Sequence, residues 1–413
     1  MRQSQLFTKT RKEAPKDETS KNASLLIRGG FINKEMAGVY SYLPLGFRVL
    51  EKIENIIREE MNAIGGVEVL LTALQDPEPW KATGRWSDEV IDTWFKTKLA
   101  NGTEIGLANT HEEPLANLMK HHIDSYKDLP VYAYQIQNKF RNELRAKSGL
   151  MRGREFLMKD LYSFTRDEKE LEQFYEKCAE AYGKIFERTG IADKTYRTFA
   201  DGGAFSKFSD EFQTLSEAGE DTIFIDEKKK LAVNKEVYTD EVLDELNLKK
   251  EDLKEAKAIE VANIFKLGTK YSEALGLVYK DESGNKIPVV MGSYGIGLGR
   301  LMGAIAEVHN DERGMVWPVS VAPFSVHILA LPGGEEEAEN IYNKMVAENK
   351  EVLYDDRRDL SAGEKLAEAD LIGIPQRAVV SDKSLKAGGV EVKIRNAEKE
   401  EVVPIEDFIS KNV

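Results

Sequence analysis

Two strand-like segments on either side of a basic connection constrain the fold more than any other part of the sequence. VYAYQIQNKF (131–140) alternates apolar and polar side chains, and REFLMKDLYSF (154–164) follows after a connection that contains glycine and many charges. Two strands joined in this way form an antiparallel hairpin with a long loop. We therefore expect an antiparallel sheet with the basic residues at the mouth of that sheet.

This basic stretch lies in an acidic protein. The chain has 413 residues and a formal net charge of -14, yet positive side chains crowd between residues 139 and 159: Lys139, Arg141, Arg145, Lys147, Arg152, Arg154 and Lys159. The overall acidity argues against a protein that coats nucleic acid nonspecifically, because neutralising phosphates supplies that kind of affinity. A local site for a polyphosphate or for one defined RNA stays open.

Length and composition limit the class of protein further. A chain of this length exceeds what one hydrophobic core usually supports, so we expect two or three domains. The single cysteine, Cys178, excludes an internal disulfide framework and a cysteine-cluster zinc site. No apolar run approaches the roughly 20 residues of a membrane helix, and the first residues lack the apolar core of a signal peptide. We expect a cytoplasmic protein.

Helices, strands and one insertion are expected along the rest of the chain. Residues 45–66 have helical periodicity and end at Gly65-Gly66, and residues 167–190 form a second amphipathic helix. Beyond Pro318, strands and helices alternate as in a compact α/β domain. We also expect a strand within 67–74, a hairpin within 91–110 that turns at Asn101-Gly102, and either a small insertion or a solvated helical linker at 226–258.

The stretch GSYGIGLGR (292–300) suggests phosphate binding. Glycines before a helix let backbone N–H groups and the helix N-terminus approach an anion. The spacing is neither a dinucleotide fingerprint nor a P-loop, which would carry Lys-Ser/Thr. Close packing of the helix explains the glycines equally well at this point.

A second candidate is NTHEE (109–113). Thr110 and Glu113 have the spacing of a helix N-cap and its reciprocal carboxylate. Capping leaves Glu112 unexplained, so that this carboxylate is available to a cation such as an amine.

The third candidate is the basic connection itself. Arg141 and Glu143 alternate along the predicted strand and so project to one face. Arginine suits bidentate contact with phosphate or carboxylate, and a neighbouring carboxylate accepts from an amino group such as that of adenine. Arg152 and Arg154 would return on the partner strand. The alternative is a solvated charged hairpin, which gives no reason for the excess of arginine.

Together these stretches resemble the three signature motifs of class II aminoacyl-tRNA synthetases. Their sequences are most similar in kind to those of the bacterial prolyl-type family. YSYLPLGFRVLEKIENIIREEM looks like the first motif, a dimer-forming helix, and THEE looks like the amino-acid-binding element. KFRNE with LMRGREFLMKDLYSF resembles the second motif, and MGSYGIGLGR the third. The segments DERGMVWP and FKLGTKYSEAL also resemble sequence segments of this family.

The resemblance implies an α+β class II catalytic domain, which is an antiparallel sheet flanked by helices, and a C-terminal α/β anticodon-binding domain. The implied boundaries are 1–225 and 259–320 for the catalytic domain, 226–258 for a short insertion and 321–413 for the anticodon-binding domain. The implied activity is that of a ligase: ATP activates L-proline to prolyl-adenylate, and the prolyl group is transferred to tRNA(Pro). A cytoplasmic homodimer is implied, with Mg²⁺ held by the ATP phosphates and no protein-caged metal.

Site residues follow from the resemblance position by position. Arg141 would bind the α-phosphate and the proline carboxylate, and Glu143 would accept from the adenine amino group. Arg152 and Arg300 would hold the γ-phosphate side of a bent ATP. The remaining ATP candidate is Thr269; the proline candidates are Thr110, Glu112, Arg141, Met158, Asp160, Phe212 and Ser293; and Arg141 and Arg300 are the catalytic candidates. Arg145, Lys147 and Arg154 either guide the tRNA acceptor end or solvate the loop.

Three departures from the family pattern are visible. Thr72 replaces a usual proline at the end of the first motif, and Ser293 replaces a common cysteine. Residues 226–258 are far too few for the domain with which many bacterial relatives hydrolyse alanyl-tRNA(Pro). We therefore predict no editing in cis and a requirement for a separate deacylase, since a proline pocket cannot strongly exclude the smaller alanine.

In the C-terminal domain, the candidates for reading anticodon guanines are Asp355, Asp356, Arg357 and Lys365, with a charged loop and helix cap as the alternative. Two alternatives to the whole interpretation remain. One is a non-catalytic paralogue that acts as an RNA-binding or regulatory module, which loss of Arg141, Glu143 or Arg300 would favour. The other is a threonyl-type synthetase, whose zinc-binding set is absent.

Overall fold

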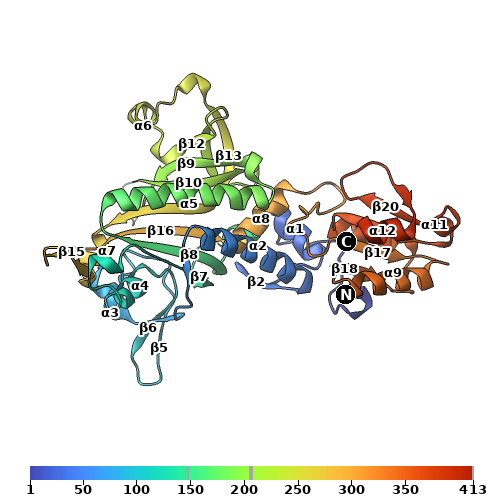
Figure 1. Cartoon of the computed structure of the whole chain (residues 1–413), viewed down its shortest axis with the longest axis horizontal. Coiled ribbons are helices and arrows are strands. Elements are labelled where there is room, and N and C mark those ends of the chain that lie inside the picture. Colours follow the sequence, from blue (N-terminus) through green and yellow to red (C-terminus); the bar gives the residue numbers. More distant parts are fainter. Residues whose placement is uncertain (145, 147, 204–207, 412–413) are drawn as a thin grey trace. The chain divides into compact units, whose positions relative to one another are not determined.

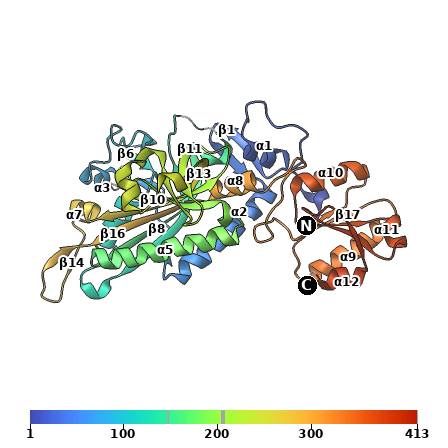
Figure 2. The same ribbon diagram turned by 90° about the horizontal axis from the view of Figure 1, so that it is seen from above.

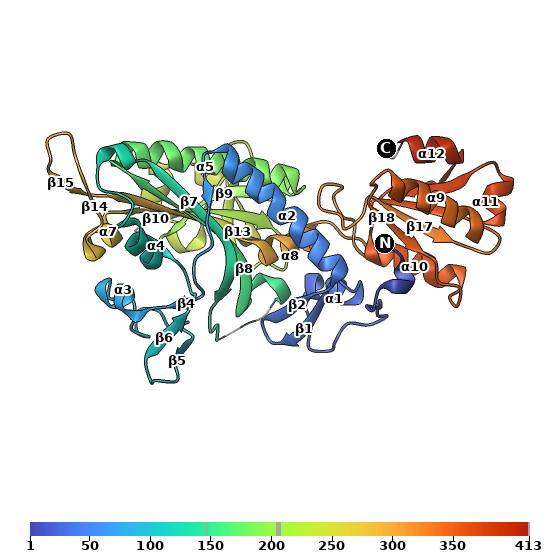
Figure 3. The same cartoon turned by 60° about the horizontal axis from the view of Figure 1, so that its bottom comes forward.

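The computed structural model describes residues 1–144, 146, 148–203 and 208–411, so Arg145 and Lys147 lie outside the described residues. Figures 1 to 3 give three views of the chain. It forms two compact units: the first comprises residues 1–35, 40–52 and 305–413, and the second residues 36–39 and 53–304. Each unit is described by itself.

A nine-stranded sheet is the framework of the second unit (Figure 1). Its order is β10-β9-β12-β11-β13-β16-β8-β7-β3, and only the β9–β12 and β3–β7 pairs are parallel. The expected antiparallel sheet is confirmed. The strands are β3 (Val67–Glu68), β7 (Val131–Phe140), β8 (Glu155–Thr165), β9 (Thr195–Asp201), β10 (Phe208–Leu215), β11 (Asp221–Asp226), β12 (Leu231–Asn234), β13 (Lys254–Gly268) and β16 (Val290–Gly297).

The β7–β8 hairpin confirms the first prediction, with one correction. The register runs from Val131 opposite Phe164 to Phe140 opposite Glu155. The four charged residues Arg141, Glu143, Arg152 and Arg154 flank the strands and do not belong to them. The prediction that each pair alternates along a strand was therefore wrong. Pairing of the hairpin persists locally, because the backbone N–H of Arg141 donates to the carbonyl of Arg154 at 2.8 Å.

Helix α5 (Glu168–Arg188) packs on β8, β13 and β16 (Figure 2) and thereby fixes which side chains face away from it. The carboxylate of Asp167 caps its N-terminus by accepting from the backbone N–H of Glu170 at 2.8 Å. Lys159 on β8 donates to the Tyr182 hydroxyl of α5 at 2.6 Å. Since side chains alternate along a strand, Met158 and Asp160 point to the opposite face.

The other predicted elements are mostly confirmed. Helix α2 spans Pro44–Ala63, and Gly65 after it has a φ of 94°. The hairpin of β5 (Lys96–Lys98) and β6 (Glu104–Leu107) turns at Gly102 with a φ of 87°. Only the ends of 67–74 are strands, in β3 and β4 (Leu74–Gln75). The remaining elements up to residue 308 are α1 (Lys21–Arg28), β1 (Ile32–Met36), β2 (Val39–Tyr42), α3 (Pro77–Ala82), α4 (Glu112–Met119), α7 (Lys270–Leu275), β14 (Val278–Lys280), β15 (Lys286–Pro288) and α8 (Leu298–Val308).

Residues 226–258 are built into the sheet. Strands β9 to β13 close into a ring, because β10 pairs with β9 and also with β13. The segment supplies β12, helix α6 (Asp240–Glu245) and the first residues of β13. The apolar side chains of Val233, Val242, Leu243 and Leu248 pack together beside this ring.

The C-terminal part of the first unit alternates strand and helix, as expected. Its sheet has the order β18-β17-β19-β20-β21, and β17 is parallel to both β18 and β19. Figure 3 shows the N-terminus of the chain beside β18, where Tyr354 N–H donates to the carbonyl of Met1 at 2.9 Å. The elements are β17 (Val326–Ala330), α9 (Glu335–Ala347), β18 (Val352–Asp355), α10 (Ala362–Ile372), β19 (Gln376–Val380), α11 (Asp382–Lys386), β20 (Val390–Ile394), β21 (Glu401–Val403) and α12 (Ile405–Lys411). None of the helices within the described ranges is long and apolar enough to cross a membrane.

Candidate active site

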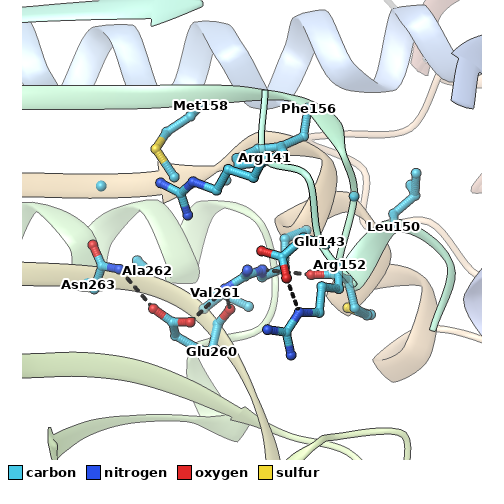
Figure 4. Close-up of a pocket in the computed structure, with 15 residues that line it drawn as sticks. Arg141, Glu143, Leu150, Arg152, Phe156, Met158, Glu260, Val261, Ala262 and Asn263 are labelled. Atoms are coloured by element: carbon cyan, nitrogen blue, oxygen red, sulfur yellow. Dashed lines mark hydrogen bonds and ion pairs between the residues drawn. The ribbon is translucent and has the colours of Figure 1, made fainter. Parts of the chain in front are cut away.

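A cavity of about 460 Å³ opens where the β7–β8 loop meets β13, β16 and the start of α8 (Figure 4). A second cavity of about 720 Å³ shares several of its walls. Both are lined by the three predicted arginines Arg141, Arg152 and Arg300, together with Glu143, Met151 and Glu260. The structure thus brings the second-motif and third-motif residues together, although they lie about 150 positions apart in the sequence.

Of the three arginines that line both cavities, Arg141 has the fewest hydrogen bonds to described residues. Its Nε donates to the carbonyl of Asn109 at 3.4 Å, and its guanidinium lies 5.3 Å from the centre of the Phe156 ring. Within the part of the chain that the structure describes, no protein partner engages its two terminal amino groups. Burial and the charge of Arg300 lower the pKa of Arg141 from its usual value. A guanidinium that lines a cavity, and whose terminal amino groups no described residue engages, is suited to an anion.

Arg300 is held firmly from α8. Its Nε donates to the carbonyl of Met151 at 2.9 Å, and its Nη1 donates to the backbone carbonyl and to the carboxylate of Glu260 at 2.8 and 2.7 Å. Glu260 also accepts from Asn263 at 2.8 Å. These contacts fix the direction of the guanidinium before any ligand arrives.

Glu143 and Arg152 are paired with each other in this structure. Arg152 Nε donates to Glu143 at 2.9 Å (Figure 4). Its Nη1 donates to Glu220 at 3.3 Å. The side chain of Arg152 is 46% exposed. An exposed arginine in such a pair can leave it at little cost, because exposed ion pairs contribute roughly 0–1 kcal/mol.

The glycines of the third motif allow close packing at one position and line the cavity at two others. Gly292, Gly295 and Gly297 belong to strand β16, not to a phosphate-binding loop. A Cβ on Gly292 would lie 2.5 Å from the Tyr294 hydroxyl, which supports the packing alternative at this position. Gly295 and Gly297 line the cavity, and α8 starts immediately after them.

A buried carboxylate lies near the arginines. Glu112 is 1% exposed and accepts from the Thr110 hydroxyl at 2.7 and 2.9 Å and from the Ser293 hydroxyl at 3.2 Å. The capping alternative for Thr110 was wrong: α4 begins at Glu112, its N-cap is His111, and no side chain caps it. Thr110 therefore serves the Glu112 carboxylate.

Arg85 links Glu112 to its neighbour Glu113. Arg85 Nη1 donates to both Glu113 oxygens at 3.0 and 3.1 Å and lies 3.5 Å from Glu112. Burial and the charge of Glu112 raise the pKa of Glu113 to about 7, although Arg85 opposes that shift. Since that raised pKa leaves Glu113 partly protonated near pH 7, a further positive charge bound beside it would favour its ionised form.

The other predicted proline and ATP residues fall into two groups. Met158 lines the cavity, and Asp160 lies on the same face of β8, where it contacts Lys139 at 2.7 Å and Tyr162 at 3.1 Å. Phe212 is placed elsewhere: its ring packs against Tyr182 and Phe186 of α5, on the opposite face of the sheet. Thr269 donates to Glu273 at 2.7 Å and lies outside the lining of both cavities.

Three functional positions were missed from the sequence. Phe156 forms an aromatic wall of the cavity, Glu260 orients Arg300, and Arg85 balances Glu112. The alternation Phe156, Met158, Asp160 along β8 was a usable signal for the first. The other two have none, since their partners lie 40 and 27 positions away in the chain.

Carboxylates crowd the wall next to Arg300. Burial and the charge of Glu260 raise the pKa of Glu211 to about 8, and burial raises that of Asp221. Such mutual repulsion fits a site that receives a cation together with an anion. Within the described residues, however, no group of three or more His, Cys, Asp or Glu side chains has the arrangement of a protein metal site.

Asp355 is the last residue of β18, Asp356 and Arg357 follow it, and Lys365 belongs to α10; Asp355, Arg357 and Lys365 form a network. Asp355 is fully buried and accepts twice from Arg357 at 2.8 Å, and Lys365 donates to the carbonyl of Ala330 at 2.8 Å. Asp356 differs, because it contacts the start of the chain: its carboxylate accepts from Ser4. Asp355, Asp356 and Arg357 lie at the carboxyl end of β18, and Lys365 reaches from α10 to the last carbonyl of the parallel strand β17, at the edge where ligands of open α/β sheets bind.

Comparison with known families defines the class. Residues 95–309 match the tRNA synthetase class II core domain (G, H, P, S and T), and residues 319–412 match the anticodon binding domain. The antiparallel sheet with its arginine-lined cleft, followed by this α/β domain, makes the chain a class II aminoacyl-tRNA synthetase.

Curated relatives define the family within that class. The proline–tRNA ligase of Hyphomonas neptunium is 39% identical over 438 residues, which cover 99% of each chain. That of Bacillus subtilis is 34% identical over 568 residues, which cover 100% of each chain. The chain belongs to the proline–tRNA ligases, which activate proline with ATP and charge tRNA with it.

Solved structures agree with the fold. Prolyl-tRNA synthetase of Cryptosporidium parvum, in complex with L-proline and AMP, superposes with a TM-score of 0.75 at 18% identity over 94% of this chain and 72% of that chain. The Giardia lamblia enzyme, in complex with prolyl-adenylate, gives a TM-score of 0.75 at 18% identity over 94% and 77%.

Proposed function

We propose that the arginine-lined cleft forms prolyl-adenylate, with Arg141 as the central catalytic residue. The observation that carries this proposal is the guanidinium of Arg141, which is directed into the cavity with its terminal amino groups unengaged by the described residues. It would contact the α-phosphate and the proline carboxylate. Preorganised positive charge of this kind is commonly the largest contribution to catalysis.

The reaction needs no general base. A carboxylate oxygen of proline forms a bond to the α-phosphorus, and the bond from that phosphorus to the bridging oxygen of pyrophosphate breaks. Negative charge that develops on the phosphoryl oxygens faces Arg141. Arg300 and Arg152 would receive the β- and γ-phosphates, and Glu143 would accept from the adenine amino group after Arg152 has turned away. In the second step the terminal adenosine hydroxyl of tRNA(Pro) would form an ester bond to the carbonyl carbon of the adenylate, the bond from that carbon to the phosphate oxygen of AMP would break, and the hydroxyl proton would pass to the departing AMP phosphate.

Proline would bind with its ammonium at Glu112. That carboxylate already accepts from Thr110 and Ser293, and a bound ammonium would favour the ionised form of the neighbouring Glu113. Met158 and Asp160 lie on the same face of β8, and we propose that they border the pyrrolidine ring of proline. We do not extend this role to Phe212, whose ring packs on α5, or the ATP role to Thr269, which lies outside the cleft.

Magnesium is proposed to arrive with ATP. Burial and the charge of Glu260 raise the pKa values of Glu211 and Asp221, so a cation nearby would favour the ionised forms of these two carboxyl groups. When bound, Mg²⁺ neutralises phosphate charge and favours departure of pyrophosphate.

Proline-dependent exchange of pyrophosphate into ATP tests the activation step. Purified protein should catalyse the exchange with L-proline. Exchange with another amino acid only would contradict the substrate, and no exchange with any amino acid would favour the non-catalytic paralogue. Arg141, Glu143 and Arg300 are all present in the cleft, so nothing in the site favours that paralogue.

Editing in cis is proposed to be absent. The Bacillus subtilis relative aligns over 568 residues and so contains sequence that this 413-residue chain lacks, whereas the Hyphomonas relative aligns over 438. Residues 226–258 are occupied by strands and one helix of the sheet's ring. Alanyl-tRNA(Pro) added to the enzyme should persist, and a separate deacylase would be needed to remove it. Rapid deacylation by the purified chain would contradict this.

The remaining proposals concern assembly and location. We propose a homodimer through the edge of the sheet near β3, where Val67, Leu70 and Leu74 are 63%, 78% and 57% exposed. Exposed apolar side chains at a sheet edge favour pairing. Sedimentation of the purified protein tests it, and a monomer at micromolar concentration would count against it. We propose the cytoplasm as the location, because tRNA, ATP and proline meet there, and we retain the predicted domain boundaries as a proposal.

A further inference from the structure

Tyr162 is a buried tyrosine beside the candidate proline site to which the proposed function gives no role. It lies on β8 on the same face as Asp160 and is 1% exposed. Its hydroxyl accepts from the backbone N–H of His111 at 3.1 Å and donates to Asp160 Oδ2 at 3.1 Å. The same hydroxyl lies 3.4 Å from that of Thr110. One phenol thus joins strand β8 to the backbone segment that carries Thr110 and Glu112.

The hydrogen of each of these two hydroxyls has a carboxylate as its acceptor. Thr110 Oγ1 lies 2.9 and 2.7 Å from the two oxygens of Glu112, so its hydrogen points to that carboxylate. The hydrogen of Tyr162 points to Asp160, because a carboxylate is a stronger acceptor than a second hydroxyl. Burial and the charges of Glu112 and Asp160 raise the pKa of Tyr162 well above its usual value, which keeps this hydrogen in place. A lone pair of the phenol oxygen is thereby directed to the N–H of His111.

Asp160, which orients the phenol, is itself fixed from strand β7. Its Oδ2 also accepts from Gln135 Nε2 at 3.0 Å, and its Oδ1 lies 2.7 Å from Lys139 Nζ. Both of these partners are buried. The Asp160 carboxylate therefore has little freedom to turn, and the hydroxyl of Tyr162 keeps one direction.

The segment that carries the amine ligands is supported from outside. His111 is the N-cap of α4, and its side chain does not cap that helix. Gln75 Nε2 donates to the carbonyl of Thr110 at 2.7 Å, and Tyr162 accepts from the N–H of the next residue, His111. The peptide group that Tyr162 contacts lies between Thr110 and Glu112 in the chain. Its position therefore determines where both of these side chains start.

We propose that Tyr162 is a positioning residue for the amine of proline: by binding the N–H of His111 it holds Thr110 and Glu112 where the ammonium enters. This role deepens the proposed function and rests on it. An acceptor that is fixed before its ligand arrives loses less conformational freedom on binding. Loss of the phenol hydroxyl should therefore weaken the binding of proline and leave the chemistry at Arg141 unchanged.

Pyrophosphate exchange by the full chain at varied proline concentration tests this role. Tyr162→Phe keeps the ring and removes the hydroxyl. It should raise KM for proline by about tenfold, with kcat and KM for ATP little changed, because a buried backbone donor loses its acceptor.

Tyr279→Phe is the matched control. It removes another buried tyrosine hydroxyl, which donates to the carbonyl of Arg166 at 3.1 Å, and Tyr279 does not line either cavity. This variant should keep the wild-type KM for proline. Thermal unfolding midpoints near that of wild type show that both variants are folded.

A double variant separates positioning from general support of the sheet. In the Glu112→Gln protein, Tyr162→Phe should change KM for proline by less than about twofold, because the carboxylate that Tyr162 positions is no longer present. Effects that multiply in the double variant, an equal rise of KM for ATP, or an unchanged KM for proline in folded Tyr162→Phe would each overturn the role of Tyr162. Absence of exchange in the wild-type protein would overturn the proposed function, and the role of Tyr162 with it.

Discussion

Replacing Glu112 by glutamine tests how the pocket recognises an amine. The substitution keeps the size and one acceptor oxygen but removes the charge of a side chain that is 1% exposed. In the wild-type pocket two carboxylates face Arg85, whose Nη1 is 3.5 Å from Glu112 and 3.0 Å from Glu113. After the substitution Arg85 and Glu113 neutralise each other, and the proline ammonium has no counter-charge.

The size of the effect follows from the distance and the burial. Two unit charges 4 Å apart interact by about 4 kcal/mol at an effective dielectric constant of 20. Part of this is offset because the glutamine oxygen still accepts a hydrogen bond, which leaves about 3 kcal/mol, or roughly a hundredfold. We expect KM for proline to rise by about that factor and KM for ATP to stay unchanged. Glu113→Gln should act in the same direction but less strongly, since Glu113 does not face the hydroxyls of Thr110 and Ser293.

Pyrophosphate exchange at varied proline concentration measures both variants. Tetrahydrofuran-2-carboxylate, which has oxygen in place of the ring nitrogen, serves as a probe without an ammonium group: it should inhibit wild type only weakly, and Glu112→Gln should not weaken that inhibition further. A thermal unfolding midpoint near that of wild type shows that the variant is folded. If folded Glu112→Gln keeps a KM for proline within threefold of wild type, the charge argument is refuted.

Three further predictions concern the phosphate site, the core and acid stability. Arg141→Lys should lower kcat for exchange by about 10²–10³-fold, because a single ammonium cannot contact phosphate and carboxylate at once; near-wild-type exchange would refute its catalytic role. Phe212→Leu should lower the free energy of unfolding by about 1 kcal/mol, measured with urea, and leave KM for proline unchanged; a raised KM with intact stability would place Phe212 at the substrate. Burial lowers the pKa of His327 to about 3, so the unfolded chain binds a proton near pH 6.5 and the folded one does not. Stability should therefore be full above pH 6.5 and fall below it by up to about 1.4 kcal/mol per pH unit, and His327→Gln should reduce that slope in urea titrations between pH 7 and pH 5; an unchanged slope would contradict it.

The sequence predicted those elements whose signal is local. The hairpin of β7 and β8, helices α2 and α5 and the C-terminal alternation all follow from periodicity and from stop residues such as Gly65. The ring of β9 to β13 could not be predicted in this way, because its closure depends on β10 pairing with two strands at once. Local patterns also extended the predicted strand through Arg141 and Glu143, whereas β7 ends at Phe140.

For the site, residue type and order in the sequence identified most of the charged residues that line the cleft. They did not identify the residues with which those side chains form hydrogen bonds and ion pairs. Arg141, Arg152, Arg300 and Glu143 do line one cleft. That Glu260 holds Arg300 is a contact between remote segments and has no local signature. Phe212 shows the converse limit: an aromatic residue on a strand is compatible with either face, and only packing on α5 decides which.

The pair formed by Glu143 and Arg152 has a consequence for nucleotide selection. On the proposed roles, the free enzyme keeps the base acceptor and a phosphate ligand occupied with each other. A nucleoside without phosphates gains Glu143 only by taking from Arg152 one of its two carboxylate partners, the other being Glu220, and free pyrophosphate gains Arg152 only by leaving Glu143 without its arginine. A nucleotide that carries both base and phosphates supplies a replacement for each. Because an exposed ion pair contributes roughly 0–1 kcal/mol, the pair adds a small preference for the whole nucleotide over its fragments.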